Sequence, residues 1–139
     1  CLVGSEMCIR DRDWIYVDDH CEALINIANS SFNNTHFNIG GNCELENIYL
    51  VKKICTILSN KLSNNIKYEK LIEFVDDRPG HDYRYAIDYS KIKNELKWEP
   101  EILFEKGLAS TIDWYIKNDL WWKKIQQTKY NQNRLGLSK

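Results

Sequence analysis

The 139-residue chain is predicted to belong to the α/β class, with helices and a few short strands. Short runs of β-branched and aromatic residues, at 14–17 and 35–39, alternate with segments whose apolar residues recur at helical spacing. These strands are too few for a stable sheet of their own. We therefore expect them to extend a larger sheet that another segment supplies. The length and the 43% hydrophobic content are typical of one soluble globular domain.

The first half of the chain is expected to hold two strands and two helices. Trp14–Val17 is the first strand, and Asp18 or Asp19 caps a helix over residues 20–29. The inward face of that helix carries Ala23, Leu24, Ile27 and Ala28. A second strand over 35–39 ends at the turn Gly40-Gly41-Asn42. A second helix then begins at Glu46 or Asn47 and ends at about Lys61.

The second half is expected to be mainly helical. Short extended pieces are predicted at 66–68 and 72–75, and an edge strand at 84–87. Asp88 caps a helix over 89–96, which ends before Pro100 because proline disfavours helix in the residue that precedes it. A longer helix covers 104–117, and a helical tail with Trp121 and Trp122 continues to about Lys129.

Charge and cysteine content exclude several classes of protein. The formal net charge is -1 and the basic residues form no cluster, so no nucleic-acid partner is expected. No apolar run reaches the length of about 20 residues that spans a bilayer, so no membrane partner is expected. The five cysteines, at 1, 8, 21, 43 and 55, are odd in number and form no Cys-x-x-Cys. They are interpreted as reduced thiols of a cytoplasmic protein.

The first residues differ in character from the rest. The chain does not begin with Met, and residues 1–8 show no clear hydrophobic period. We interpret the chain as the downstream part of a longer protein and residues 1–11 as a segment foreign to it. A start codon and stop signal directly before Cys1 in the genomic DNA would contradict this hypothesis.

The loop Asp77-Arg78-Pro79-Gly80-His81 is the strongest candidate for a ligand-binding site. Pro79 fixes its own φ angle and biases Arg78 toward an extended conformation, while Gly80 allows a ligand to approach the backbone. A guanidinium on such a stiff turn suits a phosphate or a carboxylate. Two alternatives remain. The loop is an ordinary surface turn, or Asp76, Asp77, His81 and Asp82 hold a divalent metal ion, which the charge of Arg78 opposes.

Several segments, in this order and spacing, resemble the C-terminal portion of the dTDP-glucose 4,6-dehydratases, which belong to the extended short-chain dehydrogenase/reductase family. The segments are Arg12-Asp13-Trp14-Ile15-Tyr16-Val17-Asp18-Asp19-His20, Asn38-Ile39-Gly40-Gly41-Asn42 with Asn47, Asp77-Arg78-Pro79-Gly80-His81-Asp82 with Arg84-Tyr85-Ala86-Ile87-Asp88, Leu96-x-Trp98-x-Pro100, and Trp114-Tyr115. The first two recur across nucleotide-sugar epimerases and dehydratases. The Asp-Arg-Pro-Gly-His-Asp loop is more particular to the 4,6-dehydratases.

The resemblance implies a substrate-binding role for named residues. It implies that Arg12 holds the diphosphate of a nucleotide sugar, dTDP-glucose, and that Asn47 and the loop 77–81 contact the same substrate. Two guanidinium groups and a helix N-terminus would suit the charge of a diphosphate. Each residue also has a purely structural interpretation. In that interpretation Arg12 pairs with Asp13 or Asp18, Asn47 caps its helix, and His20 is a structural histidine of the first turn.

The resemblance also implies the activity of the full-length parent. It implies an NAD-dependent lyase, a homodimer, that dehydrates dTDP-glucose to dTDP-4-keto-6-deoxy-glucose in deoxysugar (dTDP-rhamnose type) biosynthesis. The family's glycine-rich dinucleotide fingerprint and its Thr-Asp-Glu group do not occur in this sequence. Two Tyr-x-x-x-Lys matches, Tyr49 with Lys53 and Tyr89 with Lys93, lie on predicted helices and are interpreted as chance.

The catalytic residues and the dinucleotide-binding half are therefore expected in a missing N-terminal half of a Rossmann-type dehydratase. Residues 12–139 would form its substrate-binding C-terminal part, inactive alone. The alternatives are the corresponding part of a related nucleotide-sugar epimerase or decarboxylase, and a non-catalytic nucleotide-binding or structural module.

Overall fold

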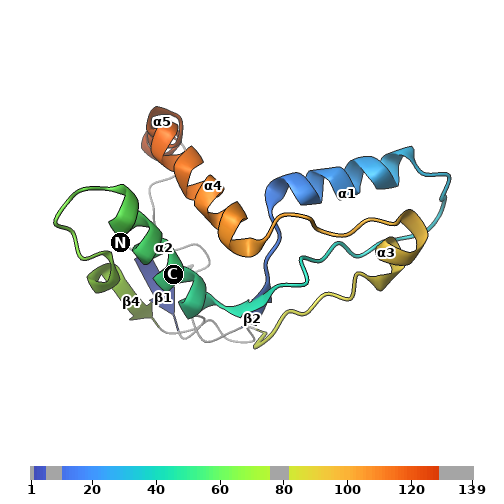
Figure 1. Cartoon of the computed structure of the whole chain (residues 1–139), viewed down its shortest axis with the longest axis horizontal. Helices are drawn as coiled ribbons and strands as arrows, with labels where there is room; N and C mark the ends of the chain where they lie inside the picture. Colours follow the sequence, from blue (N-terminus) through green and yellow to red (C-terminus); the bar gives the residue numbers. More distant parts are fainter. Residues whose placement is uncertain (1, 6–10, 76–81, 129–139) are drawn as a thin grey trace.

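The computed structural model describes residues 2–5, 11–75 and 82–128. The helices and strands, in order, are β1 (Leu2–Ser5), β2 (Asp11–Asp13), α1 (Val17–Asn29), β3 (Glu44–Glu46), α2 (Asn47–Lys61), the 3-10 helix η2 (Tyr68–Leu71), β4 (Ile72–Val75), α3 (Ser90–Leu96), α4 (Phe104–Lys117) and α5 (Asp119–Thr128). They form two groups, with α1 and α3 on one side and α2, β1, β4, α4 and α5 on the other (Figure 1). The short strand β2 lies between the two groups.

The group of α1 and α3 is held together by a small apolar core. Ala23 of α1, Ile92 of α3 and Trp98 are buried, with Trp98 only 3% exposed. The rings of Tyr89 and Trp98 meet edge to face, with their centroids 6.4 Å apart. Six half-buried apolar residues surround this core: Ile15, Ile27, Phe37, Ile39, Tyr89 and Leu96.

Two short ladders make up the β-structure of the described residues. β1 pairs with β4 in parallel, and β2 pairs with β3 in antiparallel, with Arg12 opposite Leu45. The strand predicted at 72–75 is confirmed as β4. The predicted edge strand at 84–87 is reduced to a single bridge between Asp11 and Arg84.

Two predicted strands are wrong. Residues 35–39 carry no ladder, and the strand predicted at 14–17 lies instead at Asp11–Asp13, so that Val17 already begins α1. A strand needs a partner of its own length. Trp14 finds one backbone partner, the carbonyl of Cys43 at 3.0 Å. Phe37 and Ile39 nevertheless pack against the core, so the apolar pattern indicates burial correctly although no sheet forms there. The extended piece expected at 66–68 likewise forms no strand, and η2 begins at Tyr68.

The start of α1 also differs from its prediction. Tyr16 occupies the cap position, and no side chain caps the helix. The Asp19 carboxylate, which is 4% exposed, instead accepts a hydrogen bond of 3.1 Å from the backbone N–H of Ile102. It thereby ties α1 to the segment before α4. Leu24 and Ala28, expected on the inward face, are exposed, because only the stripe of Ala23 and Ile27 faces α3 and Trp98.

The longer helices follow their predictions closely. The range 104–117 is that of α4, α2 runs from Asn47 to Lys61 as expected, and α5 contains both Trp121 and Trp122. The ammonium group of Lys61 lies 2.7 Å from the carboxylate of Asp113, which links the end of α2 to α4. None of the helices within the described ranges is both long and apolar enough to cross a membrane.

Tyr89 occupies the cap position of α3, and the predicted cap residue, Asp88, stands one residue before it. The Asp88 carboxylate accepts a 2.9 Å hydrogen bond from the backbone N–H of Ser90. Bonds from Ser90 stabilise the charged form and lower the pKa of Asp88 below its usual value. Because the folded pKa lies below the unfolded one, this contribution to stability is complete above about pH 4 to 5 and is lost as the pH falls through the folded pKa.

An Asp88→Asn variant is therefore expected to have a free energy of unfolding that depends less on pH in the acid range. The wild-type chain should lose its advantage over the variant as the pH falls from about 5 to below 3, because only the wild-type site takes up a proton there. Melting temperatures of both chains across this range check the expectation. Parallel profiles of the two chains would contradict it.

Candidate functional site

The strand β2 positions Arg12, and the next residue fixes the loop beside it. The Asp13 carboxylate accepts hydrogen bonds of 2.9 Å from the backbone N–H groups of Gly41 and Cys43. A carboxylate that accepts two N–H bonds holds the loop firmly, because bonds to a charged acceptor are stronger than neutral ones. The loop 41–43 leads directly into β3 and then into α2. Asp13 thus fixes the path between Arg12 and the start of α2.

Arg12 is the centre of the candidate site. Its Nη2 donates to the carbonyl oxygen of Asp82 at 3.3 Å, and its Nη1 lies 3.5 Å from that of Tyr83. Nη1 also donates to the carbonyl of Asp11 at 2.7 Å. The guanidinium carbon stands 4.5 Å from the centre of the Tyr85 ring. The Asp13 carboxylate, considered above as a pairing partner of Arg12, accepts the hydrogen bonds that hold the loop 41–43.

Asn47 directly follows β3, the strand that pairs with the β2 strand of Arg12. It is the first residue of α2 and comes two residues after Leu45, the partner of Arg12 in the ladder. The cap position itself belongs to Glu46, so Asn47 sits within the first turn, where the N–H groups give the helix end a partial positive charge. The Oδ1 atom of Asn47 is buried. The structure therefore places Arg12 within the β2–β3 pair and Asn47 directly after it.

The predicted loop residues Asp77, Arg78, Pro79, Gly80 and His81 lie outside the described residues. The first described residue after them is Asp82, whose carbonyl contacts Arg12. Three of the four residues weighed as metal ligands, Asp76, Asp77 and His81, also lie outside. Within the described ranges no three His, Cys, Asp or Glu side chains are grouped to hold a metal ion.

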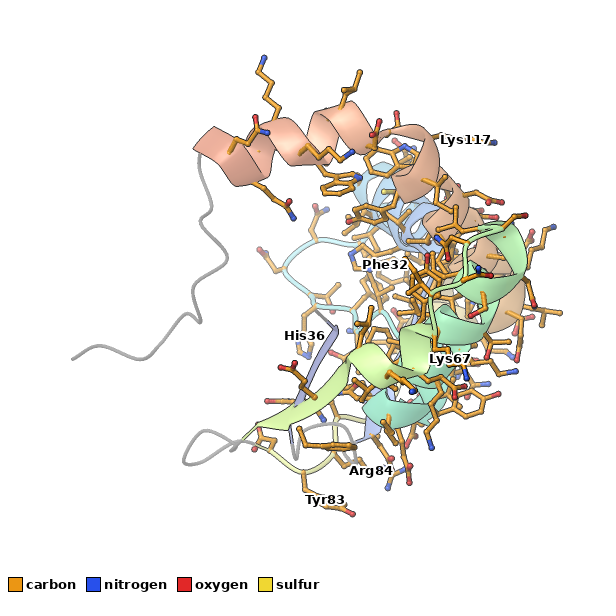
Figure 2. All side chains as sticks on the ribbon, turned by 90° about the vertical axis from the view of Figure 1, so that its left-hand side faces the viewer. Phe32, His36, Lys67, Tyr83, Arg84 and Lys117 are labelled. Atoms are coloured by element: carbon orange, nitrogen blue, oxygen red, sulfur yellow. The ribbon has the colours of Figure 1, made fainter. Side chains whose placement is uncertain are left out.

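Two residues of the site were given no role in the sequence analysis, Arg84 and Tyr85. The Nε atom of Arg84 donates to the Glu44 carboxylate of β3 at 2.7 Å, and its Nη2 contacts the same carboxylate. Tyr83 and Arg84 lie together at one end of the molecule, far from Lys117 (Figure 2). The signal that could have found them is the Arg-Tyr pair that follows the loop, but only the fold shows which strands it meets.

The residues of both Tyr-x-x-x-Lys pairs make contacts within the fold. Tyr49 and Lys53 are neighbours on α2, with the ammonium nitrogen 5.3 Å from the ring centre. The Tyr89 ring packs against Trp98, and Lys93 pairs with Glu99 at 2.5 Å. The Glu99 carboxylate raises the pKa of Lys93, which keeps this lysine charged.

The described cysteines, Cys21, Cys43 and Cys55, are free thiols. Burial, followed by the charges of Asp13 and Glu105, raises the pKa of the Cys43 thiol. Cys43 is therefore protonated at neutral pH and is not an activated nucleophile.

A cleft of about 1130 Å³ lies between the start of α1, α2 and α4. Its lining is mostly apolar and includes Trp14, Tyr16, Leu50, Phe104 and Trp114. Arg12, Asn47 and Arg84 are not among the lining residues. The apolar cleft therefore borders the candidate site at Trp14, Gly41 and Cys43.

Comparison with protein families and curated relatives gives a consistent result. The model of the family described as GDP-mannose 4,6 dehydratase matches residues 7–111. A dTDP-glucose 4,6-dehydratase of Escherichia coli is 45% identical over 130 residues, which cover 91% of this chain and 36% of that protein. One of Neisseria meningitidis serogroup B is 43% identical over 132 residues, covering 92% of this chain and 37% of that protein. The chain thus spans little more than a third of the length of these relatives.

Solved structures share the same fold. The dTDP-glucose 4,6-dehydratase of Bacillus anthracis in complex with NAD has a TM-score of 0.74 and 43% identity, covering 89% of this chain and 36% of that chain. DesIV of Streptomyces venezuelae, a dTDP-glucose 4,6-dehydratase with NAD and TYD bound, has a TM-score of 0.76 and 32% identity over the same shares. A UDP-glucose 4-epimerase of Thermotoga maritima with UDP-glucose has a TM-score of 0.70 and 27% identity, covering 84% and 35%. These matches confirm the resemblance and the α/β class of the sequence analysis.

Proposed function

Because the chain belongs to the family described as GDP-mannose 4,6 dehydratase, we propose that it is the substrate-binding C-terminal part of a dTDP-glucose 4,6-dehydratase. The parent would be a cytoplasmic, homodimeric, NAD-dependent lyase that makes dTDP-4-keto-6-deoxy-glucose for deoxysugar biosynthesis. The choice of dTDP over UDP rests on relatives: dTDP-glucose dehydratases are 45% and 48% identical to this chain over the matched residues, against 27% for the UDP-glucose epimerase.

The observation that carries the proposal is the placement of Arg12. Residues of segment 82–85 contact its guanidinium group, and its strand β2 pairs with β3, which leads directly into Asn47. A planar guanidinium can donate two parallel bonds to a phosphate, and the first turn of α2 adds a partial positive charge nearby. We assign the diphosphate to Arg12 and assign further contacts with the dTDP part to Asn47 and to Asp77, Arg78, Pro79, Gly80 and His81.

The sequence of this chain lacks the glycine fingerprint that binds the NAD pyrophosphate, because its six glycines do not have that spacing. The described glycines allow close packing instead: a Cβ on Gly41 would lie 1.9 Å from the Trp14 carbonyl, and one on Gly107 would meet the Tyr16 ring at 2.9 Å. We therefore place NAD binding and the reacting groups in polypeptide outside this chain, and expect residues 1–139 alone to be inactive.

A chimera tests the proposed function. Residues 12–139 replace the matching third of the Escherichia coli relative, and turnover of dTDP-glucose, UDP-glucose and GDP-mannose is measured. We expect turnover with dTDP-glucose and none by the 139-residue chain alone. Arg12→Ala should weaken dTDP binding by about 10- to 100-fold, because hydrogen bonds to charged groups contribute about 1.5 to 3 kcal/mol.

The control for this test is Lys52→Ala, which removes an exposed positive charge from α2. It should leave dTDP affinity unchanged. A chimera that folds and retains NAD but prefers UDP-glucose would favour the alternative, the matching part of an epimerase. A folded chimera with NAD that turns over none of the three sugars, or an Arg12→Ala chimera with unchanged dTDP affinity, would refute the proposal.

A further inference from the structure

The support of Arg12 comes from a part of the chain about 70 residues away. Two main-chain carbonyls, of Asp82 and Tyr83, face the guanidinium at 3.3 and 3.5 Å, and the Tyr85 ring lies 4.5 Å from its carbon. Both hydrogen bonds are at or beyond the long end of the usual N–H···O range. They orient the group but are weak enough for a phosphate oxygen to replace them.

Tyr85 is itself fixed at two points. Its backbone N–H donates to the carbonyl of Asp11 at 3.1 Å, which attaches it to the β2 strand. Its hydroxyl donates to the Asp82 carboxylate. The ring that faces Arg12 is therefore held at both ends, although the side chain is 43% exposed. An aromatic face attracts a cation, and a ring that is already ordered costs no further entropy when a ligand binds.

The hydroxyl bond has a second effect. The carbonyl of Asp82 already contacts Arg12, so the carboxylate of the same residue is within reach of the guanidinium after a change of rotamer. The bond from Tyr85 directs this carboxylate to the phenol instead. Without that bond, the carboxylate could pair with Arg12 and compete with a phosphate for the same donors.

We propose that Tyr85 is a positioning residue for Arg12: its ring supports the guanidinium, and its hydroxyl keeps the Asp82 carboxylate from occupying it. This inference rests on the proposed function, in which Arg12 binds the diphosphate. It explains why an acidic residue stands directly beside an anion site. The competing role for Tyr85 is purely structural, and the two roles differ in what a second substitution at Asp82 does.

The test measures dTDP affinity by calorimetry for the 139-residue chain and for Tyr85→Ala, Tyr85→Phe, Asp82→Asn and the double variant Tyr85→Phe/Asp82→Asn. Tyr85→Ala should bind dTDP at least about tenfold more weakly. Tyr85→Phe keeps the ring and should bind about fivefold more weakly, because the carboxylate is released. The double variant should return to within about twofold of Asp82→Asn, since the competing charge is gone.

Matched controls separate this inference from the proposed function. Tyr68→Phe removes a hydroxyl of the 3-10 helix η2 that accepts a bond from Asn64 at 2.8 Å, and should not change dTDP affinity. If Arg12→Ala weakens binding while both Tyr85 variants bind like the wild type, the inference fails and the proposed function stands. If Tyr85→Phe weakens binding and Asp82→Asn does not restore it, Tyr85 has only a structural role. Unchanged binding in Arg12→Ala, or no dTDP binding by the unmodified chain, counts against the proposed function itself.

Discussion

A Gly41→Ala variant is expected to lose at least about 3 kcal/mol of its free energy of unfolding, or to fail to fold. A Cβ atom on this residue would lie 1.9 Å from the carbonyl oxygen of Trp14 and 3.1 Å from the Cα of Ile15. Both are backbone atoms, so no change of rotamer relieves the overlap. The chain at 41 or at 14–15 has to move.

That movement would break several bonds at once. The backbone N–H of Gly41 donates to Asp13, and the N–H of Trp14 donates to the Cys43 carbonyl at 3.0 Å. These bonds join β2 to the segment that leads into β3. Shifting either side separates Arg12 from Asn47, so dTDP binding is expected to weaken together with stability.

Urea unfolding followed by circular dichroism checks this expectation. Gly107→Ala is the matched comparison, because its Cβ would also meet a neighbour, the Tyr16 ring at 2.9 Å. That neighbour is a side chain, and alanine favours the helix α4 by about 1 kcal/mol relative to glycine. The loss at Gly107 should therefore be much smaller. Equal losses in the two variants would show that the backbone overlap at Gly41 is not the controlling factor.

Trp98→Ala is expected to cost about 3 to 5 kcal/mol, the usual range for removing a buried large aromatic side chain. Trp98 is 3% exposed and packs between Ala23 of α1 and Ile92 of α3, with Tyr89 against its edge. No other buried residue in the described part of this core has comparable volume. Its loss removes the largest side chain of the core that α1 and α3 share.

Trp98→Phe should lower the free energy of unfolding by much less than the lost side-chain volume suggests. The indole Nε1 is buried and has no hydrogen-bond partner among the described residues, so the wild-type side chain carries a desolvation cost that phenylalanine lacks. Trp121→Ala, at a position that is 57% exposed on α5, is the control and should change stability by less than about 1 kcal/mol. Thermal unfolding of the three variants ranks their losses of stability. If Trp98→Ala loses no more stability than Trp121→Ala, Trp98 does not contribute to the core as described.

Helices were predicted well because their signals are local. The apolar spacing within 47–61 and 104–117 and the position of Pro100 define α2 and α4 without knowledge of the rest of the chain. Strands were predicted poorly because a ladder depends on a partner elsewhere. The runs at 14–17 and 35–39 have the right composition, yet they form no ladder, and only Ile15, Phe37 and Ile39 of them pack against the core.

The candidate site shows the same division. The Arg12 and Asn47 positions follow from sequence motifs, and the fold places them on adjoining segments. The contact between Arg12 and Tyr85 joins residues separated by about half of the chain and leaves no periodic signal, so no role for Tyr85 was predicted from the sequence. Only the placement of 82–85 beside β2 shows it.

The carbonyl contacts of Arg12 bear on which residues can stand at position 83. The oxygen atom that Tyr83 offers belongs to the main chain, so most side chains at that position would present it equally well. Proline at 84 would be an exception, since it restricts the residue before it. Homologous chains are thus expected to tolerate wide variation at position 83 while the path of the backbone there stays unchanged.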